Sequence, residues 1–146
     1  MNQVFNFCDS APANFAFCFC ADCATADTCM RGLSARDLTS SRTTMLTVNP
    51  LLVDRAGGTS CHYYCKAEKQ RVAYGFKRAL AKVPSGEVRG VRAKICSLVC
   101  RRDYYYLLKG EKPMYPAMQR KVGAILVSHG LTAPIEFDRY DWLYEW

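Results

Sequence analysis

The chain has 146 residues, 50% of them hydrophobic, and a formal net charge of +7. A chain of this length forms one domain or a small domain with an appendage, and its hydrophobic content excludes wholesale disorder. No apolar stretch approaches the roughly 20 residues that a membrane-spanning helix needs, so no membrane partner is expected.

Cysteine and charge divide the chain into three unlike parts. Residues 1–65 hold seven of the nine cysteines and are nearly neutral, with four Lys/Arg against five Asp/Glu. Residues 66–130 carry fifteen Lys/Arg against four Asp/Glu, a net charge of +11. Residues 131–146 have a net charge of −3 and are rich in aromatic side chains. We therefore predict a Cys-rich N-terminal region, a basic helical bundle and an acidic aromatic tail.

The start of the chain lacks the features of a secretory signal. No basic segment precedes its apolar residues, and Asp9 interrupts them. We therefore expect a cytoplasmic protein with reduced thiols. In that compartment a local cysteine cluster indicates a metal site more often than disulfides, and an odd number of cysteines suits a complete disulfide framework poorly.

The Cys-rich region predicts little regular structure. Residues 1–17 alternate small and aromatic side chains, which indicates an irregular arm or at most an edge strand. Residues 25–38 can form one or two helical turns. Residues 43–48 are rich in β-branched side chains in an alternating pattern and predict a short strand, which Asn49-Pro50 ends.

Two amphipathic helices are predicted at the start of the basic segment. Apolar side chains recur at helical spacing over residues 67–82, and Pro84 ends this helix. Ser85 suits the N-cap of a second helix, whose apolar stripe runs from Val88 to Val99.

Two further helices follow after short connections. Asp103 can cap a third helix over residues 104–109, which Gly110 closes as a residue of left-handed conformation. Pro116 suits the first turn of a fourth helix, which ends at Gly130. One apolar face of this helix is shared by Met118, Val122, Ile125 and Leu126.

The tail, residues 137–146, contains five aromatic side chains, which is too much apolar area to stay exposed. We expect it to dock on the helices through Tyr140 and Trp142. The predicted fold is mostly α: a small Cys-rich region packed on a four-helix, helix-turn-helix-like bundle, with at most one short pair of β-strands.

The helix lengths and short connections resemble the helix-turn-helix domains of the lambda repressor and Cro superfamily. Residues 91–99 take the place of the supporting helix, residues 100–103 of the turn and residues 104–109 of the recognition helix. The stretch from Leu108 to Pro113 resembles the exit that often follows such a helix. This resemblance implies DNA binding in the major groove.

A recognition helix sets its first residues on base edges, while flanking cations and amides hold phosphates. Arg101 and Arg102 lie where such contacts form. Three consecutive tyrosines cannot all face the DNA, so at least one of them packs in the core. The complete set of expected DNA-binding residues is Arg101, Arg102, Tyr104, Tyr105, Lys109 and Lys112.

Other interpretations of the basic helices stay open. Their cations can form a solvated surface, or the same helices can bind another protein. The tyrosines can also act as stacking platforms for single-stranded nucleic acid, although the sequence marks no sheet that would carry them.

Structural zinc needs four soft ligands, usually delivered as pairs of close cysteines. One candidate set joins Cys20 and Cys23 to the later pair, Cys61 and Cys65. Another set is Cys18, Cys23, Cys29 and Cys61. Several of these cysteines can equally be small buried hydrophobic residues, so the spacing leaves the ligand set open.

The order of features over residues 15–146 resembles an uncharacterised bacterial family of unknown function. The resemblance implies Cys18, Cys23, Cys29 and Cys61 as the thiol set, and it implies no activity. It rests on Cys18-Phe19, Cys23, Cys29-Met30-Arg31, Val48-Asn49-Pro50, Cys61 with Tyr63-Tyr64, Ala73-Tyr74-Gly75-Phe76, Tyr104-Tyr105, Lys109-Gly110-Glu111 and Phe137-Asp138-Arg139-Tyr140.

The inventory of reactive groups argues against an enzyme. The chain has two histidines, no paired carboxylates in apolar surroundings and no Gly-rich phosphate loop. We therefore expect a non-enzymatic, cytoplasmic DNA-binding protein with a regulatory role, stabilised by zinc held by cysteines. The alternative is a metal-stabilised adaptor that binds another protein or a second copy of itself.

Overall fold

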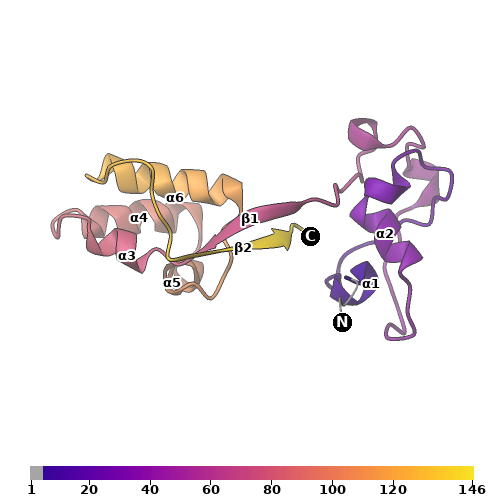
Figure 1. Cartoon of the computed structure of the whole chain (residues 1–146), viewed down its shortest axis with the longest axis horizontal. Helices are drawn as coiled ribbons and strands as arrows, with labels where there is room; N and C mark the ends of the chain where they lie inside the picture. Colours follow the sequence, from indigo (N-terminus) through magenta and orange to yellow (C-terminus); the bar gives the residue numbers. More distant parts are fainter. Residues whose placement is uncertain (1–4) are drawn as a thin grey trace. The chain divides into compact units, whose positions relative to one another are not determined.

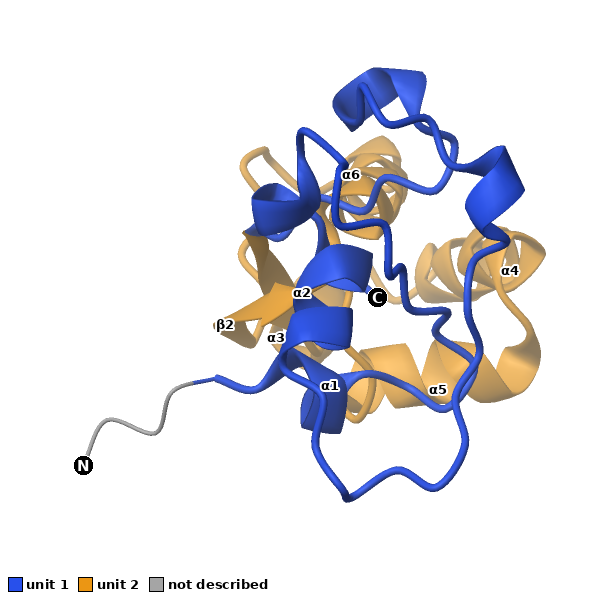
Figure 2. Cartoon of the chain, turned by 90° about the vertical axis from the view of Figure 1, so that its right-hand side faces the viewer, with its two compact units in different colours: residues 1–68, 146 blue, residues 69–145 orange. Residues whose placement is uncertain are grey.

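A computed structural model describes residues 5–146 of the chain. The chain forms two compact units, which Figure 2 colours separately. Unit 1 comprises the chain up to Glu68 together with Trp146, and unit 2 runs from Lys69 to Glu145. The described residues form six α-helices and one two-stranded sheet, so the structure is mixed and mostly helical. None of the described helices is long and apolar enough to cross a bilayer.

Unit 1 is built from short helical segments joined by loops (Figure 1). Its elements are shorter than the roughly 12–15 residues that an isolated helix needs to be stable in water, so side-chain contacts between loops must hold it together. The elements are α1 (Phe7–Ser10), η1 (Ala26–Thr28), α2 (Met30–Arg36), η2 (Pro50–Leu52) and η3 (Gly58–Ser60), where η denotes a 3-10 helix.

Two arginine side chains supply such contacts in unit 1. Arg31 donates from Nε to the carbonyl of Tyr63 at 3.0 Å and from Nη1 to the carbonyl of Ala16 at 2.7 Å. Arg42 donates from Nε to the carbonyl of Cys8 at 2.9 Å. Because loop carbonyls lack ladder partners, a planar guanidinium with five donors can satisfy several of them at once.

Unit 2 combines a two-stranded antiparallel sheet with four helices (Figure 1). The sheet runs from the pair Lys69 and Tyr144 to the pair Tyr74 and Arg139. Its elements are β1 (Lys69–Tyr74), α3 (Lys77–Ala81), α4 (Val88–Leu98), α5 (Arg101–Lys109), α6 (Pro116–Ser128) and β2 (Arg139–Tyr144).

The core of unit 2 is formed by the apolar faces of these helices together with one end of the sheet. Val91 and Ile95 from α4 and Val122 and Leu126 from α6 are fully buried. The helical spacing of these side chains predicts their burial, and this prediction is confirmed. Phe76, which follows β1, is also fully buried in this core.

The prediction of a helix over residues 67–82 is wrong for most of its length. Residues 69–74 form β1, Gly75 has a φ of +71°, and the helix is limited to residues 77–81 of α3. The apolar spacing identified side chains that become buried, but the backbone conformation follows from pairing with β2, more than 60 residues later in the chain. A local hydrophobic period carries no information about such a distant partner.

Two other predicted boundaries also change. Residues 43–48 do not form a strand, and Thr47 makes only an isolated bridge to Phe17. Helix α4 begins at Val88, after a turn that includes Ser85, so Ser85 is not its N-cap.

The ends of α5 and α6 are closer to the predictions. Helix α5 begins at Arg101 with Cys100 as N-cap, so Asp103 lies in the first turn instead of capping it. Gly110 closes α5 in the left-handed conformation, with a φ of +77°. Pro116 is the first residue of α6, as predicted from its missing N–H group.

The aromatic tail splits between the two units. Phe137 is buried and Tyr140 is half-buried against the core of unit 2, as expected. Trp142 is 59% exposed, so the prediction that it packs on the helices is wrong. Trp146 belongs to unit 1, where its ring centroid lies 5.0 Å from that of Phe15. The packing of the Cys-rich region on the bundle stays a prediction.

Candidate nucleic-acid interface and thiol cluster

Helix α5 begins with two arginines that are exposed to solvent. Arg101 and Arg102 follow the extended N-cap residue Cys100, and no side chain caps the first backbone N–H groups. Neither arginine forms a salt bridge among residues 5–146. Uncapped N–H groups beside two guanidinium groups form a helix start that attracts phosphate.

Lys112 is engaged with a carboxylate of α5. Its Nζ donates to Oδ2 of Asp103 at 2.9 Å, and this hydrogen bond lowers the pKa of Asp103 from its ordinary value. The pair ties the segment after α5 to the first turn of the helix. Lys112 therefore offers less free charge to a ligand than Lys109, which is exposed and forms no salt bridge among the described residues.

Two of the three consecutive tyrosines serve packing. Tyr104 is 2% exposed, and its ring meets that of Phe76 edge-on at a centroid distance of 6.0 Å. Burial raises the pKa of Tyr104. Tyr105 is half-buried, and the guanidinium of Arg92 lies 5.2 Å from its ring centroid. The expectation that at least one tyrosine packs in the core is confirmed, and Tyr104 has no surface to offer DNA.

Tyr106 is the tyrosine that α5 presents to solvent, at 41% exposure. It lies four residues after Arg102 and three before Lys109, so the three side chains share one face of the helix. We call Arg102, Tyr106 and Lys109, together with the adjoining Arg101 at the start of the helix, the α5 face. Tyr106 was not among the predicted DNA-binding residues, although its spacing from Arg102 places it on this face.

The helix before α5 adds further positive charge. Arg89 and Lys94 on α4 are exposed and form no salt bridge within the described part of the chain. Unit 2 as a whole carries fifteen Lys/Arg against seven Asp/Glu, a net charge of +8. A surplus of this size attracts polyanions over a distance of about one Debye length.

In unit 1, three other cysteines, Cys20, Cys23 and Cys29, lie near Cys18. Burial raises the pKa of Cys18, and the neighbouring thiols of Cys20, Cys29 and Cys23 raise it further. Thiolates are the donors that structural zinc prefers. Within residues 5–146, however, no three Cys, His, Asp or Glu side chains are placed together as ligands. The donor chemistry therefore fits zinc, whereas the side-chain placement forms no ligand set.

The later cysteines lie in different surroundings. Thr25 links the loop before Cys61 to the early cluster: its Oγ1 accepts from the N–H of Gly58 at 2.8 Å and lies 3.6 Å from Sγ of Cys23. Cys61 follows directly, with its N–H donating to the carbonyl of Gly58. Cys65 is placed with its Sγ 3.9 Å from Sδ of the buried Met30.

A hollow of about 430 Å³ in unit 1 adjoins the thiol cluster. Cys18 and Cys20 line it together with the apolar side chains of Phe19, Val48 and Val53. Phe19 is 54% exposed at its rim. The hollow therefore joins two thiols to an accessible apolar surface.

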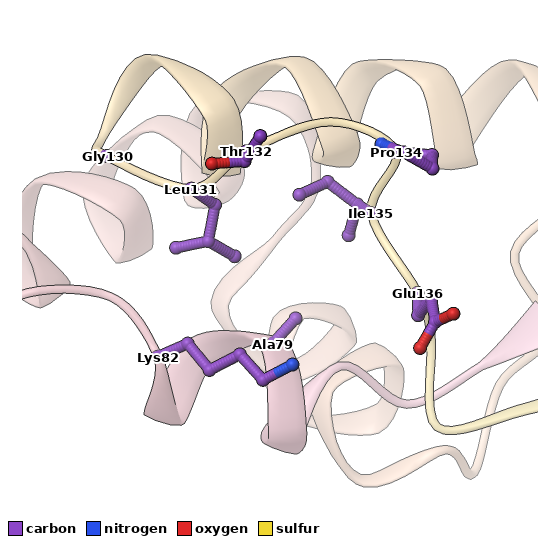
Figure 3. A pocket seen from close by; sticks show the side chains of 8 residues that line it. All are labelled: Ala79, Lys82, Gly130, Leu131, Thr132, Pro134, Ile135 and Glu136. Atoms are coloured by element: carbon purple, nitrogen blue, oxygen red, sulfur yellow. The ribbon is translucent and has the colours of Figure 1, made fainter.

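Unit 2 has a hollow of about 350 Å³ between the end of α3 and the segment after α6 (Figure 3). Leu131 and Ile135 point into it, and the aliphatic chain of Lys82 lies along its opposite side. Glu136 stands at one end.

A model of one protein family, described as a family of unknown function (DUF6078), matches residues 1–146. The chain belongs to the DUF6078 family. No curated protein and no solved structure matches the chain.

Membership of DUF6078 confirms the expectation that the chain belongs to a family of unknown function. The match extends over both units, so the Cys-rich region and the basic helices occur together in a single family pattern. DUF6078 carries no stated activity, and the function must be argued from the side chains themselves.

Proposed function

We propose that the chain is a non-enzymatic, cytoplasmic protein that binds nucleic acid and holds duplex DNA against α5. The observation that carries the proposal is the α5 face, where exposed Arg102 and Lys109 lie about one turn before and after the exposed Tyr106, and exposed Arg101 stands at the start of the helix. None of the three cations forms a salt bridge among residues 5–146. Exposed arginines without acidic partners match phosphates and guanine edges through paired N–H donors.

The placement of these side chains suits a helix that enters a groove. Arg101 and Arg102 stand at the start of α5, where free backbone N–H groups add positive potential. Tyr106 and Lys109 continue the same face by one and two turns. Lys112 contributes less, because Asp103 already binds its ammonium group.

Duplex binding should depend steeply on salt and on the α5 arginines. The double substitution Arg101→Ala with Arg102→Ala should weaken duplex binding by about tenfold and lower the salt slope by about two, at roughly 0.9 per lost phosphate contact. Fluorescence anisotropy with random duplexes at several salt concentrations measures both quantities.

The matched control removes two charges from another helix, with Arg120→Ala and Lys121→Ala on α6. If both double variants lose the same affinity for duplex DNA, the DNA is attracted to the whole charged surface, which would contradict a role for α5. Absence of binding tighter than ~10⁻⁴ M at physiological salt would remove DNA as the ligand.

The zinc expectation stays a part of this proposal, with Cys18, Cys23, Cys29 and Cys61 as ligands. Protein purified under reducing conditions should then carry about one zinc per chain, since four thiolates complete a closed structural site. Elemental analysis tests this directly. If the purified protein contains no zinc and treatment with a chelator leaves its melting temperature unchanged, these cysteines are packing residues.

A protein-binding adaptor is the second candidate function, and the surface of unit 1 favours it. Leu51 and Leu52 are 89% and 61% exposed, and Phe19 is 54% exposed. Clustered apolar side chains on a surface mark sites of association. If a second copy binds there, sedimentation should show a dimer at high concentration, and Leu51→Ser with Leu52→Ser should return it to monomer.

A further inference from the structure

The β1–β2 ribbon has two faces with different surroundings. In an antiparallel pair, directly opposed residues point to the same side and successive residues alternate. The register places Val72 opposite Asp141 on one face, and Val72 is fully buried there. The other face carries the pairs Lys69 with Tyr144, Arg71 with Trp142, and Ala73 with Tyr140. At the last of these pairs Ala73 is fully buried in the core of unit 2 and Tyr140 packs against that core, so the part of this face that is open to a ligand lies around Trp142.

Cations and aromatic rings alternate on this second face. The Nζ of Lys69 lies 5.6 Å from the ring centroid of Tyr144. The guanidinium of Arg71 lies 3.9 Å from the ring centroid of Tyr140. Between them stands Trp142, whose side chain is 59% exposed. We call Lys69, Arg71, Trp142 and Tyr144 the ribbon face, and leave out Tyr140 because it packs against the core of unit 2.

Neither β1 nor β2 places an acidic side chain on the ribbon face. Asp141 lies on the opposite face by the strand alternation, and Glu145 follows β2, where it accepts from the side chain of Gln70 at 2.8 Å. The ribbon face is therefore basic as well as aromatic. Trp142 lies outside the core of unit 2, and its large indole ring is exposed to water on the face that carries Lys69 and Arg71.

The backbone beneath the ribbon face is well supported. The Tyr115 hydroxyl donates to the carbonyl of Tyr144 at 2.9 Å, and the side-chain amide of Gln119 donates to the carbonyl of Arg71 at 2.7 Å. Both donors come from the start of α6 and the residue before it. The rings and cations are thus mounted on strands that α6 holds in place, which lowers the entropy lost when a ligand binds.

We propose that the ribbon face stacks the bases of a single-stranded nucleic acid. The inference rests on the proposed nucleic-acid binding for its class of ligand, but it uses a surface different from the α5 face. Aromatic rings stack on unpaired bases of any sequence, and nearby cations hold the backbone phosphates. In a duplex the flat faces of the bases are already stacked on one another, so an exposed indole suits single strands better. Stacking does not depend on the sugar, so both DNA and RNA strands fit this face.

Fluorescence of Trp142 gives a direct readout of stacking. The chain has two tryptophans, and Trp146→Phe leaves Trp142 as the only one. In this variant, oligothymidylate and oligouridylate of about twelve nucleotides should quench the emission as they bind. Trp142→Ala should weaken binding of both by about tenfold, whereas Trp142→Phe should keep most of the affinity, because phenylalanine also stacks.

Two controls separate stacking from charge attraction. Phe19→Ala removes a comparably exposed ring from unit 1 and should leave the affinity unchanged. An abasic strand of the same length has the same phosphates, and it should bind more weakly and leave Trp142 unquenched. A second variant, Lys69→Gln with Arg71→Gln, should lower the affinity and the salt slope even if Trp142→Ala perturbs folding.

The outcomes distinguish this inference from the role of α5. Suppose that Arg101→Ala with Arg102→Ala abolishes duplex binding, whereas Trp142→Ala has no effect on the binding of single strands. This result would overturn the ribbon proposal and leave the α5 proposal intact. Equal binding of abasic and base-containing strands would also overturn it. Quenching as strong with a duplex as with single strands would show that the ribbon enters a groove, which contradicts the proposed target. Single-strand binding that depends on Trp142 without any duplex binding would support the ribbon and remove the α5 assignment.

Discussion

At the scale of single residues, Gly75 decides how the chain passes from β1 to α3. Its φ of +71° lies in the left-handed region, which a residue with a Cβ adopts only with strain. A Cβ built there would stand 2.6 Å from Oδ2 of Asp138. Both the backbone conformation and the available space therefore require glycine at this position.

Substitution of Gly75 by alanine should destabilise the protein by about 1–3 kcal/mol, on the scale of a residue forced into a sparsely populated conformation. Urea unfolding monitored by circular dichroism measures this. Gly86→Ala is the matched control, since no atom lies within 4 Å of the added Cβ and its φ is not positive. Equal midpoints for the two variants would contradict the structural role of Gly75.

Burial of Tyr104 predicts a pH dependence of stability. Burial raises the pKa of Tyr104 in the folded state above its ordinary value of about 10. The contribution of Tyr104 to the free energy of unfolding is therefore fully present below pH ~10, and it is lost as the pH rises through the folded-state pKa. Tyr104→Phe cannot ionise and should lose less stability over this alkaline range. Urea unfolding from pH 8 upward tests this.

Tyr106→Phe serves as the control for this alkaline effect. Tyr106 is 41% exposed, so removal of its hydroxyl should leave the pH dependence as it is in the natural chain. Identical pH profiles for the natural protein and Tyr104→Phe would show that burial of this phenol has no influence on alkaline unfolding.

At the scale of elements, Asp138 connects the segment before β2 to α3. Helix α3 begins after Phe76, which provides no side-chain cap. The carboxylate of Asp138 accepts instead from the backbone N–H groups of Lys77 and Arg78 at 2.8 and 3.1 Å. A residue about 60 positions later in the chain thus caps this short helix, and its negative charge suits the positive end of the helix dipole.

Removal of this distant cap by Asp138→Ala should cost about 0.5–2 kcal/mol, the usual range for a lost N-cap. Asp138→Asn should retain part of that stability, because its amide oxygen still accepts from an N–H group. Thermal unfolding compares the variants. Asp141→Ala removes the same charge from β2, and it should have little effect. Among residues 5–146, the Asp141 carboxylate accepts only from the neighbouring N–H of Trp142. A cost from Asp141→Ala as large as that from Asp138→Ala would point to net charge as the cause.

At the scale of the whole molecule, unit 2 contains its own core. The buried cluster that includes Phe76, Ile95 and Leu126 draws all its members from residues 73–137. Unit 1 buries apolar side chains of its own, among them Phe17 and Met30, and adds the carbonyl contacts of Arg31 and Arg42. Each unit therefore has buried side chains that belong to it alone.

A fragment of residues 69–145 should fold without the rest of the chain, because it keeps its core and both strands. It should show helical circular dichroism and a cooperative melting transition. As a control, a fragment of residues 69–136 lacks β2 and should melt without a clear transition, since β1 and α3 lose their partners. A noncooperative 69–145 fragment would mean that unit 2 needs contacts beyond its own core.

Several features of this chain are determined by local sequence. The apolar spacing of α4 and α6 predicts which side chains are buried, and Gly110 and Pro116 mark helix ends through their backbone chemistry. The separation of charge into a nearly neutral part and a basic part is also readable without a structure. Each of these properties depends on residues within a few turns of one another, or on composition alone.

Only the tertiary structure decided that residues 69–74 form a strand, because their partner β2 lies near the other end of the chain. It also decided which aromatic rings face solvent: Tyr104 is buried whereas Tyr106 and Trp142 are exposed. The apolar spacing over residues 67–82 correctly predicted which side chains are buried, but it predicted a helix where residues 69–74 form a strand. The free energy of strand pairing comes from contacts between distant segments, so a local sequence pattern could not predict it. The aromatic face of the ribbon exists only because the two strands pair.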